Sequence, residues 1–289
     1  MNQIMVEAPA KINLALDIVG VNEKGYHLMK MMMQAVSICD QVFLKKTDSG
    51  IVVGCDDPSI PCDETNIAYR CAELFFAHTG QTGGAEIFLH KEIPQQAGMA
   101  GGSADGAGVL EGLNELYETG LSLEELCEIG VKAGADIPFC LMGGTAKVEG
   151  IGEKITPVAS MPSCWIVIAK PKQGISTKEA FEEFDRRNIE PKLRLEVMEQ
   201  ALEEQNLSNL CGELYNALEL VCPLEEVSRI EEWMKSFGAL GAKMTGSGSA
   251  VFGIFEDFSK AMACQKKLKS KYEDCFLCRP RDYGCELFD

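Results

Sequence analysis

The sequence predicts an α+β fold in two domains, and three observations carry this prediction. Strand-like and helix-like stretches are mixed without the regular repetition of a doubly wound βαβ fold. At 289 residues, the chain has room for about two domains of ordinary size. A buried-looking strand at 163–171 opens a second block. We expect the boundary near 155–162, with an N-terminal domain at residues 1–157 and a C-terminal domain at residues 158–289.

The first expected element is a strand from residue 4 to about residue 18. Apolar and polar side chains alternate there, so that Ile12 and Leu14 face one side while Lys11 and Asn13 share the other. A turn signal follows at 21–27. The rest of the N-terminal block is expected to contain strands at 33–46, 50–55 (a glycine-bounded, hairpin-like piece), 85–94 and 143–155, and helices at 65–79, 103–118 and 122–133.

The C-terminal block shows the same mixture of strand-like and helix-like runs. We expect strands at 163–171, 242–255 and 273–280, and helices at 177–185, 192–204, 224–237 and 258–271. No internal repeat is visible, so a solenoid or propeller is not indicated.

Composition and charge favour a folded protein that acts on small molecules. Hydrophobic residues make up 46% and charged residues 25% of the chain, as in ordinary globular proteins. A net charge of −17 would repel nucleic acid and anionic membranes. The amino terminus lacks a secretory signal, and no run approaches the roughly 20 apolar residues of a membrane span. We therefore expect a cytoplasmic protein without nucleic-acid or membrane partners, either a monomer or a homodimer.

The thirteen cysteines do not indicate a disulfide framework, because their number is odd and their spacings follow no pattern. The single CxxC, Cys275 to Cys278, lies in a strand-like stretch, where residues three apart point to opposite faces. A shared metal is therefore disfavoured. We expect most of the cysteines to be reduced thiols of the core.

A stretch rich in glycine and alanine, IPQQAGMAGGSADGAG at 93–108, immediately precedes a helical pattern that starts near Gly102 or Ser103. The first turn of a helix carries unpaired N–H groups and a partial positive charge, and small residues let phosphate oxygens approach them. A flexible loop is the alternative, but the pattern favours a phosphate site. The common GxxxxGK[ST] and GxGxxG motifs are absent, so this is a different kind of nucleotide loop.

The residues from Pro94 onward, PQQAGMAGGSADGAG, resemble the central motif of the GHMP kinase family, whose members phosphorylate small metabolites. APAKINLALDI at 8–18 resembles the first family motif, and GAKMTGSGSAVFGIF at 241–255 resembles the third. GYH at 25–27 and GADIPFCLMGGTAKVEGIGE at 134–153 are similar to the branch that acts on 4-diphosphocytidyl-2-C-methyl-D-erythritol. The resemblance covers almost the whole chain with its motifs in order.

This resemblance implies a GHMP kinase fold with an N-terminal ribosomal-protein-like α/β domain and a C-terminal ferredoxin-like α/β domain. It also implies ATP and Mg²⁺ as cofactors and phosphorylation of the 2-hydroxyl of the cytidylyl substrate, a step of non-mevalonate isoprenoid biosynthesis. Two positions depart from the branch pattern, since Ala100 replaces a glycine and Ala104 replaces the second serine. Ser103 is then the candidate in the loop for a metal contact. The residues implied in ATP binding are Pro94, Gln95, Gln96, Ala97, Gly98, Met99, Ala100, Gly101, Gly102, Ser103 and Ala104.

Phosphoryl transfer requires charge neutralisation, in-line positioning and a group that orients the acceptor hydroxyl. The resemblance implies that Asp136 is the base or orienting residue and that Lys11 beside it stabilises charge. Taken alone, Lys11 would be a solvated strand residue and Asp136 an ordinary helix N-cap. With three motifs in order, we favour the catalytic interpretation.

For the acceptor, the resemblance implies that Tyr26 stacks on cytosine, that His27 hydrogen-bonds the base edge, and that Phe181 stacks on the far side. Asn13 would contact the same region, and Phe181 is matched by its spacing from Thr177. The remaining candidates are Gly246 and Ser247 in the TGSGS stretch, which forms either a plain turn or part of the acceptor site, and Lys147 and Lys172 as further phosphate contacts.

Three alternatives stay open at this point. The chain could be another kinase of the family, such as a homoserine or mevalonate kinase, if Tyr26, His27 and Phe181 do not share a pocket. It could be an inactive sensor that binds a sugar or nucleotide, although Lys11 and Asp136 argue against this. A purely structural interaction protein would leave the glycine-rich loop unexplained.

Overall fold

The structure is a computed structural model that describes residues 2–187 and 189–288. The described strands form two sheets, one of eight strands and one of four. They are β1 (Gln3–Val21), β2 (His27–Thr47), β3 (Gly50–Cys55), β4 (Gly84–His90), β5 (Thr145–Gly150), β6 (Lys154–Pro157), β7 (Trp165–Ala169), β8 (Tyr215–Asn216), β9 (Gly241–Met244), β10 (Val251–Phe255), β11 (Cys275–Cys278) and β12 (Glu286–Phe288).

The described helices are α1 (Ile67–Thr79), α2 (Gly101–Leu116), α3 (Leu123–Gly130), α4 (Ile137–Met142), α5 (Thr177–Asp185), α6 (Leu195–Glu203), α7 (Leu207–Gly212), the 3-10 helix η1 (Ala217–Val221), α8 (Glu225–Ser236) and α9 (Phe258–Lys269). None of these helices is long and apolar enough to cross a lipid bilayer. The helices and strands described above confirm the predicted mixture of the two.

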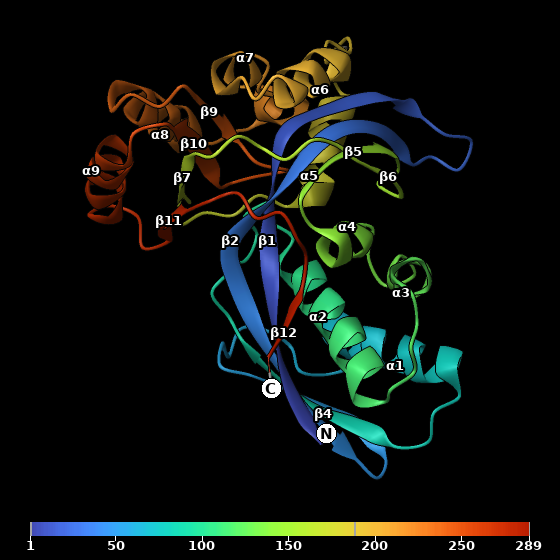
Figure 1. The fold of residues 1–289 in the computed structure, drawn as a ribbon. Coiled ribbons are helices and arrows are strands. Elements are labelled where there is room, and N and C mark those ends of the chain that lie inside the picture. The colour runs from blue at the N-terminus through green and yellow to red at the C-terminus, as the bar shows by residue number, and fades with distance from the viewer. Residues whose placement is uncertain (1, 188, 289) are drawn as a thin grey trace.

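The larger sheet is built on the antiparallel ribbon of β1 and β2. Its order is β12-β1-β2-β4-β3, with β5 and β8 pairing to β2 and β1 and with β6 pairing to β5. Figure 1 shows the ribbon running the length of the molecule, with α1 and α2 beside its lower half and the smaller sheet beside its upper half. The register of the ribbon shifts between Pro9 and Lys11 and again between Asn13 and Ala15. Such bulges change the direction of side chains, and these two flank the polar residues expected to share a face.

Most predicted elements are confirmed, but one pairing is wrong. The hairpin-like interpretation of residues 50–55 fails because β3 pairs in parallel with β4 rather than folding back on β2. Parallel neighbours need a crossover, which α1 supplies. For α4 the sequence analysis gave only a possible N-cap at Asp136, and it missed α7, η1, β8 and β12. All of these have six residues or fewer and are too short to show an apolar period.

Two glycines bring α2 into close contact with the sheet. A Cβ at Gly108 would lie 2.9 Å from Cγ2 of Val42, and a Cβ at Gly112 would lie 2.5 Å from Cδ1 of Leu44. Both side chains belong to β2, so the helix lies where only a residue without a side chain fits. These two glycines of α2 therefore serve packing, and this packing fixes the position of the helix start.

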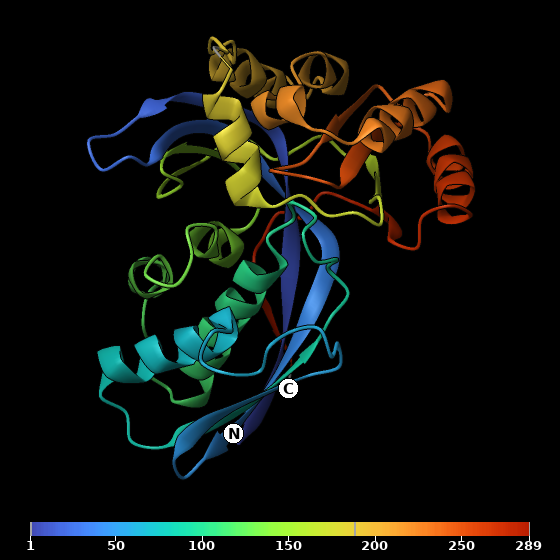
Figure 2. The ribbon, with the colours of Figure 1, turned by 180° about the vertical axis from the view of Figure 1, so that it is seen from behind.

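The smaller sheet has the order β11-β7-β10-β9, with all pairs antiparallel. Helices α8 and α9 pack against it. Beyond β11 the chain returns to the larger sheet, where β12 pairs with β1. The guanidinium of Arg281 fastens this tail by ion pairs to Glu7 at 3.2 Å and Glu286 at 2.9 Å. Figure 2 shows the two termini at the same end of the molecule.

All thirteen cysteines are free, and seven of them are buried. Burial raises the pKa of both Cys275 and Cys278 far above the ordinary thiol value, so neither is a ready thiolate. Cys275 and Cys264 belong to one hydrophobic core cluster, whereas Cys278 and Cys164 belong to the other, in keeping with the expected placement of Cys275 and Cys278 on opposite faces. The expected placement of cysteines in the core is confirmed for the seven buried residues.

We predict that Gly112→Val lowers the free energy of unfolding by about 2 kcal/mol, because the new side chain would overlap Leu44 and force helix and sheet apart. Urea unfolding followed by circular dichroism measures this change. Gly212→Val is the matched control, since a Cβ at Gly212 would meet open space. Equal stability of the two variants would show that α2 does not pack as described.

Candidate active site

A cleft of about 810 Å³ contains most of the residues proposed from the motifs. It lies between the β1–β2 ribbon, the 94–100 loop with the start of α2, the start of α5, and the 245–249 turn that joins β9 to β10. The predicted residues that line it are Lys11, Asn13, Pro94, Gln95, Gln96, Ala97, Gly98, Met99, Ala100, Gly101, Gly102, Ser103, Asp136, Thr177, Phe181, Gly246 and Ser247. Five predicted residues do not line it, namely Tyr26, His27, Ala104, Lys147 and Lys172.

Helix α2 begins at Gly101, within two residues of the predicted start. Its N-cap is Ala100, and no side chain caps the helix. The amides of the first turn are therefore left for solvent or a ligand, and small residues surround them. This end of the cleft can hold an anion through main-chain groups and the helix dipole, even though the protein as a whole is acidic.

The loop before α2 is held from two sides. The amide of Lys11 donates to the carbonyl of Met99 at 3.2 Å, and the amide of Ser249 donates to the carbonyl of Gln96 at 3.2 Å. Gly98 has φ of +74°, and a Cβ there would lie 2.1 Å from the carbonyl oxygen of Thr245. The 245–249 turn thus packs directly against the loop, which fixes the loop's shape.

Lys11 and Asp136 meet at the middle of the cleft. The buried ammonium of Lys11 donates to Asn13 Oδ1 at 2.7 Å and to the carbonyl of Gly98 at 3.1 Å, and lies 3.7 Å from Asp136 Oδ2. Asp136 occupies the N-cap position of α4, but its side chain makes no capping hydrogen bond. The carboxylate is 32% exposed and lines the cleft. An ordinary N-cap would be bound to backbone amides, so this carboxylate is free for another partner.

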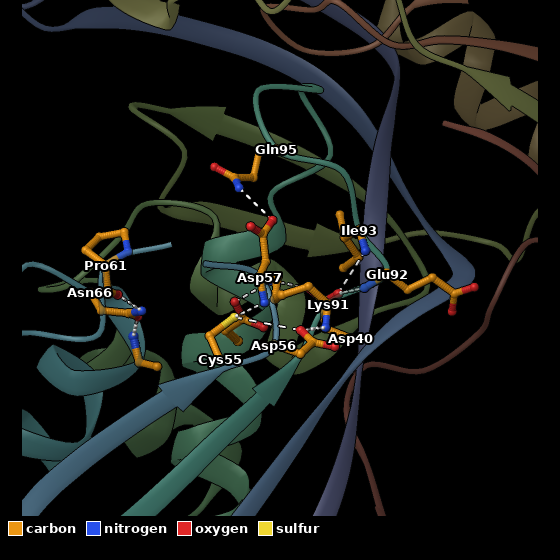
Figure 3. Close-up of polar contacts among 12 residues, drawn as sticks. Asp40, Cys55, Asp56, Asp57, Pro61, Asn66, Lys91, Glu92, Ile93 and Gln95 are labelled. Carbon is orange, nitrogen blue, oxygen red and sulfur yellow. Dashed lines mark hydrogen bonds and ion pairs between the residues drawn. The ribbon is translucent and has the colours of Figure 1, made fainter. Parts of the chain in front are cut away.

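Beneath the loop lies a cluster that the sequence analysis missed, formed by Asp40, Lys91 and Asp105. Buried Lys91 forms ion pairs with both carboxylates. Asp40 Oδ1 also accepts the amides of Glu92 at 2.6 Å and Ile93 at 2.8 Å (Figure 3). These bonds fix the junction between β4 and the loop. The three side chains come from β2, the end of β4 and α2, so no local sequence pattern connects them.

Burial raises the pKa of Asp105 to about 7, against the opposing attraction of Lys91. Among the described residues, its Oδ1 has no hydrogen-bond partner. Asp40 and Asp105 both form ion pairs with the single ammonium group of Lys91. Lys91 is therefore neutralised by the protein itself and does not offer a free cation to a ligand.

The segment between β3 and α1 forms one wall of the cleft, through Ile60, Pro61, Thr65, Asn66 and Ile67. Asn66 organises it, because its Oδ1 accepts the amide of Ala68 at 2.8 Å while its Nδ2 donates to the carbonyl of Pro61 at 2.7 Å. Figure 3 shows Gln95 reaching from the loop to Asp57 of this segment, at 3.0 Å. Three of the five residues named, Ile60, Pro61 and Ile67, are apolar, so this wall offers an apolar surface to a ligand.

At the opposite end of the cleft, Thr177 Oγ1 and Ser247 Oγ lie 2.8 Å apart, which joins α5 to the 245–249 turn. Phe181 follows one turn later on α5 and faces the cleft. The ring of His27 stacks on Phe181, with ring centroids 4.6 Å apart. Tyr26 lies on the preceding turn and is 58% exposed. The structure thus brings His27 and Phe181 together and leaves Tyr26 at the surface.

Neither of the two additional lysines lines the cleft. Lys147 forms an ion pair with Glu199 of α6 at 2.8 Å, and the hydrogen bond to this carboxylate raises the pKa of the lysine. Lys172 lies in the exposed segment before α5. In this arrangement the lysine that reaches the loop from within the cleft is Lys11.

Two family models match the chain, described as GHMP kinases N terminal domain over residues 66–144 and GHMP kinases C terminal over residues 198–274. A relative from Clostridium tetani (strain Massachusetts / E88), named 4-diphosphocytidyl-2-C-methyl-D-erythritol kinase, is 43% identical over 94% of this chain and 98% of its own. A relative of the same name from Clostridium beijerinckii is 41% identical over 95% of this chain and 99% of its own. The chain belongs to the GHMP kinase family.

Solved structures of GHMP kinases agree with this membership. A crystal structure of 4-(cytidine 5'-diphospho)-2C-methyl-D-erythritol kinase matches with a TM-score of 0.81 and 31% identity, over 96% of this chain and 98% of that one. A homoserine kinase from Cytophaga hutchinsonii matches with a TM-score of 0.80 at 18% identity, over 100% and 98%, which shows the fold alone. The predicted two-domain GHMP kinase fold and the family resemblance are confirmed.

We predict that Ala100→Gly raises the free energy of unfolding by about 0.5–1 kcal/mol. Ala100 has φ of +61°, a left-handed conformation that glycine adopts without the steric cost of a Cβ. Ala77→Gly is the control, because this exposed alanine lies within helix α1 and should lose about 1 kcal/mol instead. Denaturant unfolding measures both, and the same sign for the two variants would contradict the conformation described at Ala100.

Proposed function

We propose that the protein transfers the γ-phosphate of ATP to the 2-hydroxyl of 4-diphosphocytidyl-2-C-methyl-D-erythritol. The observation that supports this proposal is that Lys11 and Asp136 lie in one cleft, which the uncapped start of α2 and the ring of Phe181 also line. The names of relatives at 40–43% identity favour this acceptor over homoserine or mevalonate.

In this proposal ATP lies along the loop from Pro94 to Ala104. Its phosphates accept hydrogen bonds from the amides at the start of α2, and its base lies against the wall that contains Ile60 and Asn66. Ala104 does not line the cleft. Its buried side chain packs the first turn of α2 against the core. The loop carries no lysine, so binding relies on main-chain dipoles.

The donor set also fits Mg²⁺. Ser103 lines the cleft in the first turn of α2 and offers a hard oxygen, and magnesium usually combines one or two protein oxygens with phosphate oxygens and water. Bound there, the ion would neutralise phosphate charge. Because Ala104 has no hydroxyl, Ser103 would supply this contact without help from the neighbouring position.

Asp136 and Lys11 divide the chemistry between them. The carboxylate of Asp136, which no backbone amide binds, accepts a hydrogen bond from the acceptor hydroxyl and orients it for in-line attack. Lys11 sits beside it with two hydrogen bonds already made, so its charge is fixed in place without reorganisation. The lysine also stabilises the charge that develops on the transferred phosphoryl group.

The acceptor occupies the end of the cleft near α5. Its cytosine stacks on Phe181, while Asn13, Thr177, Gly246 and Ser247 surround the diphosphate and the sugar alcohol. Tyr26 covers the base from the exposed turn that precedes β2. His27 belongs to the same region through its contact with Phe181.

We also propose a domain division at residues 1–157 and 158–289, with the cleft between the two parts. The family models at 66–144 and 198–274 fall on either side of this boundary. A cytoplasmic location and small-molecule partners fit the net charge of −17, which disfavours nucleic acid and anionic membranes.

ADP release measured with three acceptors tests the function. We expect turnover with the cytidylyl substrate and none with homoserine or mevalonate. If homoserine or mevalonate supports turnover and the cytidylyl substrate does not, the proposed acceptor is wrong. No ADP release with any acceptor, while the protein still binds ATP, would favour a sensor over an enzyme.

We predict that Asp136→Asn lowers kcat at least about a hundredfold and leaves ATP affinity within about twofold of wild type. The reason is that the side chain of Asp136 makes no capping hydrogen bond to α4, while Lys11 keeps its bonds to Asn13 and Gly98. Lys11→Met should weaken both turnover and ATP binding, because it removes a support of the loop. Calorimetric titration with ATP distinguishes the loss of turnover from the loss of ATP binding. Near-normal turnover of a correctly folded Asp136→Asn variant would refute the role assigned to Asp136.

A further inference from the structure

Asn216 is a buried polar residue that binds the 245–249 turn, and only 2% of it is exposed. Its Nδ2 donates to the carbonyl of Met244 at 2.7 Å and to the carbonyl of Gly246 at 2.9 Å. Its Oδ1 accepts the amide of Leu218 at 3.0 Å and so caps η1. Both hydrogens of the side-chain amide and its oxygen are therefore engaged.

These bonds determine which side chain fits at position 216. The two carbonyl oxygens need a group that donates twice, and the amide of Leu218 needs an acceptor on the same side chain. Asparagine meets both requirements. A carboxylate of the same size would keep the cap but would place an oxygen without a proton against two carbonyl oxygens. The contact is thus selective for the amide group and does more than fill space.

Asn216 also lies where the two sheets come together. It belongs to β8, which pairs in parallel with β1 through Ala15 and Leu16. The turn that its side chain binds follows β9 of the smaller sheet. Leu16, its partner in register, and Leu218, whose amide it accepts, both line the cleft. One side chain therefore ties the turn of the smaller sheet to the first strand of the larger sheet, next to the cleft.

The two carbonyls that Asn216 binds flank Thr245, and Thr245 contacts the loop before α2. Its Oγ1 accepts the amide of Asn13 at 2.9 Å and donates to the carbonyl of Gly98 at 3.3 Å. Later in the turn, the amides of Ser249 and Ala250 donate to two carbonyls of the same loop at 3.2 Å and 3.3 Å. The position of the turn is thus passed directly to the loop.

We propose that Asn216 is a positioning residue for phosphoryl transfer, which holds the 245–249 turn so that Gly246 and Ser247 lie at the correct distance from the loop before α2. The inference rests on the proposed function, in which these two residues surround the acceptor while the loop carries the phosphates. Asn216 is absent from the lining of the cleft, so it acts through the turn.

The physical reason is alignment. The attacking oxygen and the phosphorus must meet in line, and a misplacement of about 1 Å lowers the rate strongly. The turn contains Gly246 and Gly248, with φ of +55° and +89°, so its backbone has few torsional restraints of its own. The side chain of Asn216 supplies the missing restraint before the acceptor binds.

The test compares Asn216→Asp and the milder Asn216→Ser with wild type, and Asn206→Asp is the matched control. Asn206 caps α7 as Asn216 caps η1, since its side chain accepts the amide of Asn209 at 3.0 Å. A carboxylate caps a helix as well as an amide does. Within the described residues, Nδ2 of Asn206 donates no hydrogen bond, so the same exchange breaks nothing there.

Two readouts are compared. The first is kcat and KM for the cytidylyl acceptor and for ATP. The second is the rate of amide hydrogen exchange at Ser249 and Ala250, measured by NMR relative to the amides of β7 in the same sheet. The exchange measurement needs no turnover, and the comparison with β7 separates local opening of the turn from a general loss of stability.

We expect Asn216→Asp to lower kcat/KM for the acceptor about tenfold to thirtyfold and to change KM for ATP less than about threefold. ATP is less affected because the start of α2 is held by the packing of that helix on β2. Exchange at Ser249 and Ala250 should become at least about tenfold faster than in wild type. Asn216→Ser keeps a cap and should show smaller changes in the same direction, whereas Asn206→Asp should match wild type within about twofold.

Three results would overturn the inference. Wild-type exchange at Ser249 and Ala250 in both Asn216 variants would show that this side chain does not hold the turn. Faster exchange with unchanged kcat/KM would show that the position of the turn does not matter for the reaction. An equal loss of kcat/KM in Asn206→Asp would show a general effect of the added charge.

If Asn216→Asp does not fold, Asn216→Ser decides by the same two readouts. If the wild type turns over no cytidylyl acceptor, the proposed function fails, whereas the exchange rates still decide whether Asn216 holds the turn against the loop.

Discussion

The site depends on one buried ammonium group, that of Lys11. Its hydrogen bonds to Asn13 and to the carbonyl of Gly98, together with its proximity to Asp136, connect the first strand, the phosphate loop and the start of α4. A buried charge is costly unless its partners are correctly placed, so this group constrains everything that it touches. The loop, the carboxylate and the strand are therefore fixed relative to one another before any ligand binds.

The two lysines that line the cleft have different surroundings, which bears on how an acidic protein would hold a triphosphate in the proposed function. Lys91 is neutralised by Asp40 and Asp105 and serves as a structural brace under the loop. Lys11 has one carboxylate nearby, and that carboxylate faces the cleft. In the proposed function, most of the attraction for phosphate comes from backbone amides at the start of α2, where the glycines that follow allow the helix to approach the sheet.

Local patterns in the sequence predicted the features that depend on residues close together in the chain. Alternation predicted β1 and the shared face of Lys11 and Asn13, and the small residues predicted the start of α2 to within two positions. Long-range contacts were not predictable in this way: Lys91 meets Asp40 across 51 positions, and His27 meets Asp185 across 158. The sequence also shows that Ala100 replaces a glycine, but only the backbone reveals its left-handed conformation.

The central claim is that main-chain amides at the start of α2 hold the phosphates. Amide chemical shifts of Gly101, Gly102 and Ser103, measured by NMR as a non-hydrolysable ATP analogue and Mg²⁺ are added, test it most directly. The account predicts large downfield shifts of these three amides that saturate with the binding of the nucleotide. Tight binding that leaves all three amides unshifted would contradict it.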